Sequence, residues 1–192
     1  MIAIRRAEER GRIGRGPATS YLTFSCEQFK DPEHTGFRAL RAINEDVVTP
    51  GARVSHAAGE SMEMFSCLLE GELDLVDEDG RRKRLERGSI VRTTGSKSSL
   101  RTTSGERSRV LQVWLQPNLA EDTVVSRSVL KHGDRVEHVL SAGRHVWVQV
   151  LRGAVEVNGH LLTESDGAAV SREESLGLFA RQDSEVMLFE LA

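Results

Sequence analysis

The chain has 192 residues, of which 39% are hydrophobic and 29% charged, so it is long enough to bury a core. The formal net charge of −3 gives no overall attraction to nucleic acid or to an anionic membrane, and we expect neither as a direct partner. No segment approaches the roughly 20 apolar residues of a membrane span, and the N-terminus lacks a signal-peptide stretch. We therefore expect a cytoplasmic protein.

Short alternating runs separated by turn residues fill the first half of the chain. The segment "ESMEMFSCLLE" lies between a glycine-rich approach and Gly71, which favours a buried strand over a helix. "ELDLVDEDG" follows with an Asp-Gly hairpin turn at 79–80, and "VLQVWLQP" at 110–117 is a further apolar strand. Cys26 and Cys67 lie in such runs and are expected to be buried free thiols, because two cysteines make no disulfide framework.

The second half repeats the pattern of the first. "HVWVQVLRGAVEVNG" gives a strand, a glycine, a second strand and an Asn-Gly turn, and "EVMLFELA" at 185–192 closes the chain. Gly71 and Gly153 occupy equivalent places 82 residues apart, which indicates an internal duplication. We expect an all-β protein of two small antiparallel barrels, with domains at 1–118 and 119–192 and a link within 116–122.

Several stretches of this sequence resemble the pirin-like proteins. The block "SYLTFSCEQFKDPEHTGFRALRAINEDVVTPG" at 20–51 is similar to their opening block, and "LLEGELDL" and "LQVWLQP" continue the match. "GRHVWVQVLRGAVEVNG" and "DGAAVS" resemble the second domain of bacterial members. The resemblance implies a bicupin fold of two cupin (jelly-roll) barrels. It also implies one Fe(II) in the N-terminal barrel, and a link to quercetin dioxygenase activity in bacteria or transcriptional co-regulation in eukaryotes.

The metal ligands of that family do not occur in this sequence. The resemblance implies a His-x-His pair just before a Met-Glu dipeptide, and counting from Met62–Glu63 places the pair on Ala57 and Gly59. A later His-x-Glu pair, counted from Gly88, falls on Arg101 and Thr103. Arginine stays protonated and binds no metal in the ordinary way. We therefore expect a degenerate site without Fe(II), without another cofactor and without catalytic residues.

His56 lies one residue away from the first of these positions. Because side chains alternate along a strand, this offset predicts that it points to the opposite face, as a surface or rim histidine. An alternative is that a bulge turns His56 inward, where it, Glu60 and Glu63 would hold a divalent ion weakly.

Arg101 suggests two other uses of the pocket, whose candidate residues are His56, Glu60, Glu63, Arg101 and Thr103. It could replace the metal by an internal ion pair with Glu63 or Glu60, supported by nearby threonine hydroxyls. Alternatively, Arg101 could hold a small anionic ligand.

Other chemical signals in the sequence are weak. "RRKR" at 81–84 follows acidic residues and is interpreted as a solvated hairpin tip. The remaining histidines show no ligand spacing: His34, His132, His138, His145 and His160.

Our main hypothesis is a pirin-like bicupin with a metal-free N-terminal site, acting as a non-catalytic binding or regulatory protein for a small-molecule or protein partner. The alternative is an enzyme, a metal-dependent quercetin 2,3-dioxygenase-type oxidoreductase with non-standard ligands.

Overall fold

The computed structural model describes residues 1–14, 16–77, 79–103, 105–117 and 122–192, and only the backbone of 58–60. Strands joined by turns form the fold, which confirms the predicted all-β class. The elements are β1 (Ile2–Arg5), the 3-10 turn η1 (Ala7–Glu9), β2 (Gly11–Gly14), β3 (Ala18–Leu22), β4 (Leu40–Val48), β5 (Arg53–Glu70), β6 (Leu73–Val76), β7 (Arg82–Leu85), β8 (Ile90–Thr102), β9 (Ser108–Leu115), β10 (Val124–Leu130), β11 (Arg135–Val139), β12 (His145–Arg152), β13 (Ala154–Val157), β14 (His160–Thr163), β15 (Gly167–Ser171), β16 (Ser175–Ala180) and β17 (Ser184–Leu191).

The chain divides into two compact units, which we call the first and second barrels. The first barrel comprises residues 11–120, and the second comprises residues 1–10 together with 121–192. The sequence placed residues 1–10 in the first domain, whereas the structure pairs β1 with β15 of the second barrel. The reason is apolar burial, because Ile2 and Ile4 pack against the second core. The boundary expected between residues 118 and 119 lies outside the described residues.

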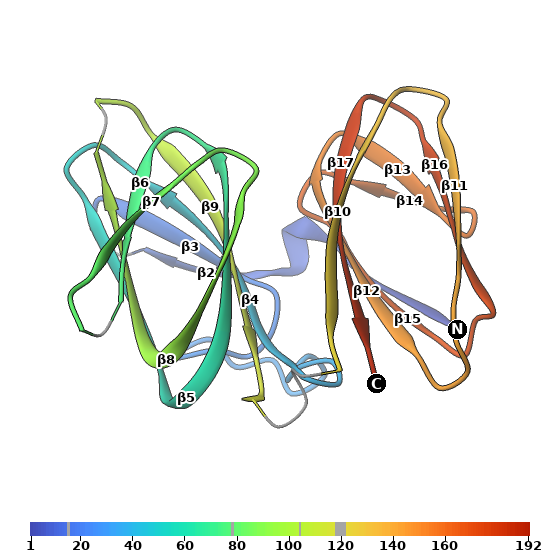
Figure 1. Cartoon of the computed structure of the whole chain (residues 1–192), viewed down its shortest axis with the longest axis horizontal. Helices are drawn as coiled ribbons and strands as arrows, with labels where there is room; N and C mark the ends of the chain where they lie inside the picture. Colours follow the sequence, from blue (N-terminus) through green and yellow to red (C-terminus); the bar gives the residue numbers. More distant parts are fainter. Residues whose placement is uncertain (15, 78, 104, 118–121) are drawn as a thin grey trace. The chain divides into compact units, whose positions relative to one another are not determined.

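The first barrel is one antiparallel sheet in the order β2-β3-β4-β9-β5-β8-β6-β7. Its two longest strands, β5 and β8, pair along their length and run side by side in Figure 1. Alternate residues of β5, β8 and β9, among them Val54, Leu100 and Val110, share one apolar core. That shared cluster identifies the interior face of the barrel, on which the candidate site also lies.

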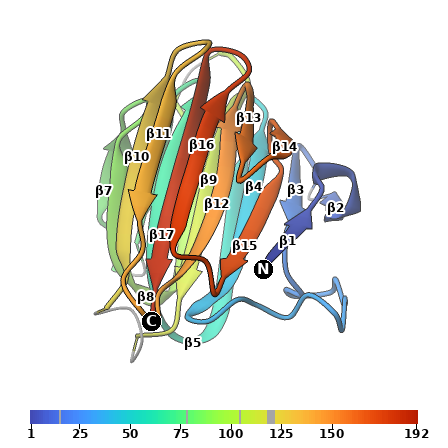
Figure 2. The same ribbon diagram turned by 90° about the vertical axis from the view of Figure 1, so that its right-hand side faces the viewer.

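The second barrel is made of two sheets, in the orders β1-β15-β12-β17-β10 and β11-β16-β13-β14. Figure 2 shows β1 lying along β15 at the edge of the first of these. Its core is formed by hydrophobic side chains from both sheets: Leu130, Leu140, Val146, Val148, Val150, Val155, Val157, Leu162, Ala168, Val170, Leu176, Leu178, Ala180, Val186 and Leu188.

Equivalent glycines support the internal duplication. Gly71 and Gly153 both have positive φ, +79° and +80°, a backbone conformation that favours glycine. A Cβ at Gly71 would collide with Ser108, and one at Gly153 would collide with Ser184. Each serine hydroxyl bonds both backbone groups of the residue after its glycine, at 3.0 to 3.1 Å. The same corner is therefore built twice.

The predicted strands and the predicted Asn-Gly hairpin turn are confirmed. The segment at 60–70 lies within β5, and the predicted strands at 110–117 and 185–192 become β9 and β17. Asn158 and Gly159, at φ +44° and +83°, form the two-residue turn between the paired strands β13 and β14. Of the two free thiols, Cys67 is buried and Cys26 is half-buried. Among the described residues, no helix has the length and apolar character needed to cross a membrane.

Candidate functional site

The interior of the first barrel contains a polar region beside its apolar core, whereas the core of the second barrel is made of apolar side chains. Asn44 and Asp46 on β4, Ser66 on β5, Ser98 on β8 and Gln112 on β9 are all at least 98% buried. They alternate with outward-facing residues on strands that also supply the apolar core. Buried polar side chains cost free energy unless they are hydrogen-bonded. The buried polar side chains of the first barrel therefore make its interior the candidate functional site.

His56 is the centre of a buried hydrogen-bond network. Its ring is only 2% exposed. Nε2 lies 2.8 Å from the Asp46 carboxylate, and Nδ1 lies 3.2 Å from Glu27. Ser20 donates to the other oxygen of Asp46 at 2.5 Å, and the indole of Trp114 meets the imidazole edge to face. Both ring nitrogens therefore lie within hydrogen-bonding distance of a carboxylate oxygen, so the imidazole is held from two sides.

The prediction of a surface or rim position for His56 is therefore wrong. Val54 and His56 face inward opposite Leu100 and Ser98, whereas Ala57 is exposed. The ladder between β5 and β8 shifts between Ala57 and Met62, where β5 carries extra residues. The bulge that the sequence left open thus exists, and it follows His56.

The residues that the sequence assigned to the family's metal-ligand positions do not place metal-binding side chains inside the barrel. Ala57, Arg101 and Thr103 are exposed, and Gly59 has no side chain to offer. The neighbours Leu100 and Thr102 are the residues of β8 that face inward. Among the described residues, no three His, Cys, Asp or Glu side chains are grouped so as to hold a metal ion.

Arg101 does not form the internal ion pair that the sequence suggested. It lies on the outer face of β8, opposite Arg53 of β5 and Asp74 of β6. Glu63 is also on the outer face, where Arg92 binds both of its carboxylate oxygens at 2.5 to 2.6 Å. The hypothesis that Arg101 holds an anion inside the barrel fails for the same geometric reason, because odd-numbered residues of this part of β8 point outward.

The five pocket candidates are thus separated by the structure. His56 alone is placed in the interior, while Glu63, Arg101 and Thr103 lie on the outside. The side chain of Glu60 lies outside the described residues.

Three interior side chains carry polar atoms with no hydrogen-bond partner among the described residues. These atoms are the oxygen and nitrogen of the Asn44 amide, the amide oxygen of Gln112 and the indole nitrogen of Trp114. Asn44 stands directly opposite Gln112 in the ladder, and Trp114 lies two residues further along the same face. The nitrogen of Gln112 is used, since it donates to Ser98 at 3.2 Å.

Leaving such atoms unpaired is costly. Each buried polar group without a partner costs about 1–3 kcal/mol, so native proteins almost always supply one. These two acceptors and two donors are therefore the interior groups that a water molecule or another polar molecule would satisfy if it entered the barrel.

Sequence reasoning missed most of these residues. A partial signal was present, because Asn44 and Asp46 lie two residues apart in "LRAINEDVV", although Glu45 stands between them, and Gln112 interrupts "VLQVWL". Polar residues spaced by two in a strand that is otherwise buried share one face, and such a face is the interior of a binding barrel.

Two antiparallel jelly-roll barrels in tandem, one with a polar interior, define a bicupin. A family model described as "Quercetinase C-terminal cupin domain" matches residues 117–191. The crystal structure of YhhW from Escherichia coli is 30% identical and has a TM-score of 0.88, covering 100% of this chain and 98% of that one. The chain belongs to the pirin and quercetinase family of bicupins.

Other relatives match this chain over its whole length. A protein of Escherichia coli strain K12 named "Quercetin 2,3-dioxygenase" is 29% identical, covering 100% of this chain and 99% of its own length. A "Pirin-like protein" of Caulobacter vibrioides is 23% identical with full coverage of both chains. Bacterial pirin YhhW has also been crystallised in complex with nickel(II), at 30% identity and a TM-score of 0.87 over 100% of this chain and 99% of that one.

Proposed function

We propose that this bicupin binds a small, hydroxyl-bearing molecule inside its first barrel without a transition metal, acting as a binding protein rather than an oxygenase. The observation that supports this proposal is the set of unpartnered polar atoms on Asn44, Gln112 and Trp114. Two of them donate and two accept, and none carries a charge. A hydroxyl group both donates and accepts, so a polyhydroxylated guest matches this set better than a simple anion does.

A second candidate is a quercetin 2,3-dioxygenase that holds its metal with non-standard ligands. The comparisons favour it over the first candidate, because relatives of equal length carry that name. The residues at the family's ligand positions argue against it, since they offer a methyl group, a hydrogen atom, a guanidinium and a hydroxyl. Both candidates use the same barrel, and quercetin, a planar polyphenol, is a suitable probe for both.

The two candidates differ in metal content and turnover. The protein is purified anaerobically with Fe(II) or Ni(II) supplied, and its metal content is measured by elemental analysis. About one metal per chain together with oxygen uptake on adding quercetin supports the enzyme. Quercetin binding with neither metal nor oxygen uptake supports the binding protein.

Binding is followed by tryptophan fluorescence in a Trp147→Phe background, which leaves Trp114 as the chain's sole tryptophan. In this background, Asn44→Leu and Gln112→Leu are expected to weaken quercetin binding at least tenfold, because each replaces an interior amide by an apolar side chain of similar volume. Gln182→Leu, at an exposed amide of the second barrel, serves as the matched control. Equal affinity in all three variants would exclude the interior as the binding site.

A further inference from the structure

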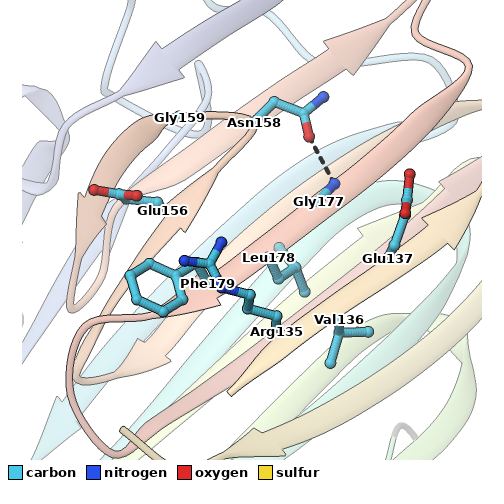
Figure 3. Close-up of a pocket in the computed structure, with 9 residues that line it drawn as sticks. All are labelled: Arg135, Val136, Glu137, Glu156, Asn158, Gly159, Gly177, Leu178 and Phe179. Atoms are coloured by element: carbon cyan, nitrogen blue, oxygen red, sulfur yellow. Dashed lines mark hydrogen bonds between the residues drawn. The ribbon is translucent and has the colours of Figure 1, made fainter. Parts of the chain in front are cut away.

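The second barrel has a groove of about 580 Å³ on the outer face of its four-stranded sheet. Strands β11, β16 and β13 form its floor, and all five residues of β11 are exposed (Figure 3). This volume lies within the range of about 300–1,000 Å³ that is usual for small-molecule sites. The groove belongs to a different unit from the Asn44 and Gln112 site and is independent of it.

Phe179 forms an aromatic platform in this groove. The guanidinium carbon of Arg135 lies 4.2 Å from its ring centroid, and that of Arg181 lies 4.5 Å away. In Figure 3 the Arg135 side chain runs beside the ring. Stacking of this kind fixes a guanidinium while leaving its N–H groups directed outward for recognition.

The two arginines differ in whether their guanidinium groups already have an ion-pair partner. Arg181 is used by Glu156, to which it donates two hydrogen bonds of 2.8 and 2.5 Å. The side chain of Arg135 makes no ion pair or hydrogen bond with a described residue, and the same is true of the side chain of Glu137. Arg135 and Glu137 share the outer face of β11, so their Cα atoms are about 7 Å apart.

The floor between these two charges is open and rigid. Gly177 lies opposite Glu137 and has no side chain to fill the groove. Asn158 fixes the backbone there, since its oxygen accepts from the Gly177 N–H at 2.6 Å and its nitrogen donates to the Ser175 carbonyl at 3.0 Å. A Cβ added to Gly177 would lie 3.3 Å from that Asn158 oxygen.

We propose that this groove binds an amino-acid-like zwitterion with an aromatic or apolar side chain. Its carboxylate pairs with Arg135 and its ammonium group with Glu137, while its side chain lies against Phe179 and over Gly177. Charge complementarity supports this assignment. The groove offers one uncommitted positive and one uncommitted negative group, so a ligand bearing a single charge would leave one of them without a partner.

The test compares three aromatic probes that differ in charge: phenylalanine, phenylacetate and phenethylamine. Binding to the full-length protein is measured by ligand-observed NMR or calorimetry. Phenylalanine is expected to bind at least tenfold more tightly than either singly charged analogue, because each analogue loses one charge-assisted contact. No binding of phenylalanine, or equal binding of phenylacetate, would overturn the proposal.

Variants locate the site. Arg135→Gln and Glu137→Gln are each expected to weaken phenylalanine binding at least tenfold, and each is expected to lose the preference over the analogue that lacks its partner charge. Both side chains are exposed, so both variants should fold. Lys131→Gln is the matched control, since it removes an exposed charge of the same barrel outside the groove. Unchanged affinity in the two groove variants would place the ligand elsewhere and refute the assignment.

Discussion

Replacing His56 by leucine should destabilise the first barrel strongly, although the two side chains are similar in size. The substitution removes the ring that lies 2.8 Å from Asp46, and the oxygen of this fully buried carboxylate that faced the ring loses that contact, while Ser20 still donates to the other oxygen. Breaking a buried charge pair by removing one partner costs about 3–5 kcal/mol. The contact with Glu27, whose side chain is 22% exposed, adds at most about 1 kcal/mol.

The loss can be measured by urea unfolding followed through Trp114 fluorescence, in the Trp147→Phe background. A loss of about 3–5 kcal/mol corresponds to a fall in Tm of about 6–20 °C for a chain of this size. His160→Leu, at an exposed histidine of the second barrel, is expected to change the free energy of unfolding by less than about 0.5 kcal/mol.

A double-mutant cycle isolates the contact between His56 and Asp46. Asp46→Asn keeps the shape of the side chain and removes its charge. The double variant should therefore lose less stability than the sum of the two single variants, by about 0.5–3 kcal/mol. A His56→Leu variant as stable as its parent, or strict additivity in the cycle, would show that the contact between His56 and Asp46 does not stabilise the barrel.

Three further predictions test the outer face, the acid response and the repeated corner. Arg92→Ala should lower the free energy of unfolding by about 0.2–1 kcal/mol because it removes the ion pair with Glu63. Arg101→Ala should lower it by less than about 0.5 kcal/mol because Arg101 is exposed. The reverse order in urea titrations would support an interior role of Arg101. The hydrogen bond from His138, and after it the one from Arg144, lowers the pKa of Glu190 in the folded protein. The ionised Glu190 therefore stabilises the fold above the ordinary glutamate pKa of about 4.3, and this stabilisation is lost as the pH falls through the lower pKa of the folded state. Glu190→Gln should therefore reduce the acid sensitivity of the second barrel in unfolding curves between about pH 3 and pH 7, and an unchanged profile would contradict this assignment. An alanine in the left-handed conformation costs roughly 1–2 kcal/mol, and Gly159→Ala, whose Cβ would lie in open space, should cost only that amount of unfolding free energy. Gly153→Ala, at a similar φ, should cost more because its Cβ would collide with Ser184. Equal losses in thermal melts would show that the turn at Gly153 is not tightly packed.

The sequence was sufficient for those features that depend on local pattern. Alternating apolar residues specify strands because side chains of a strand alternate between faces, and Asn158-Gly159 specifies its hairpin because the turn needs positive φ. The equivalent Gly71 and Gly153 revealed the duplication for the same reason. The loss of the family's metal ligands stays a prediction, since counting from Met62 to Ala57 and Gly59 crosses the bulge in β5.

Only the tertiary structure decided which face each candidate side chain occupies. The side-chain period of a strand is two, so an error of one residue in register exchanges the inside and the outside. Counting from Met62 and Gly88 placed His56 outside and Arg101 inside, whereas the ladder of β5 and β8, with its bulge after Ala57, does the opposite. Partners distant in sequence, such as Asp46 and Glu27 for His56, are brought together by the closing of the barrel, and no local pattern specifies them.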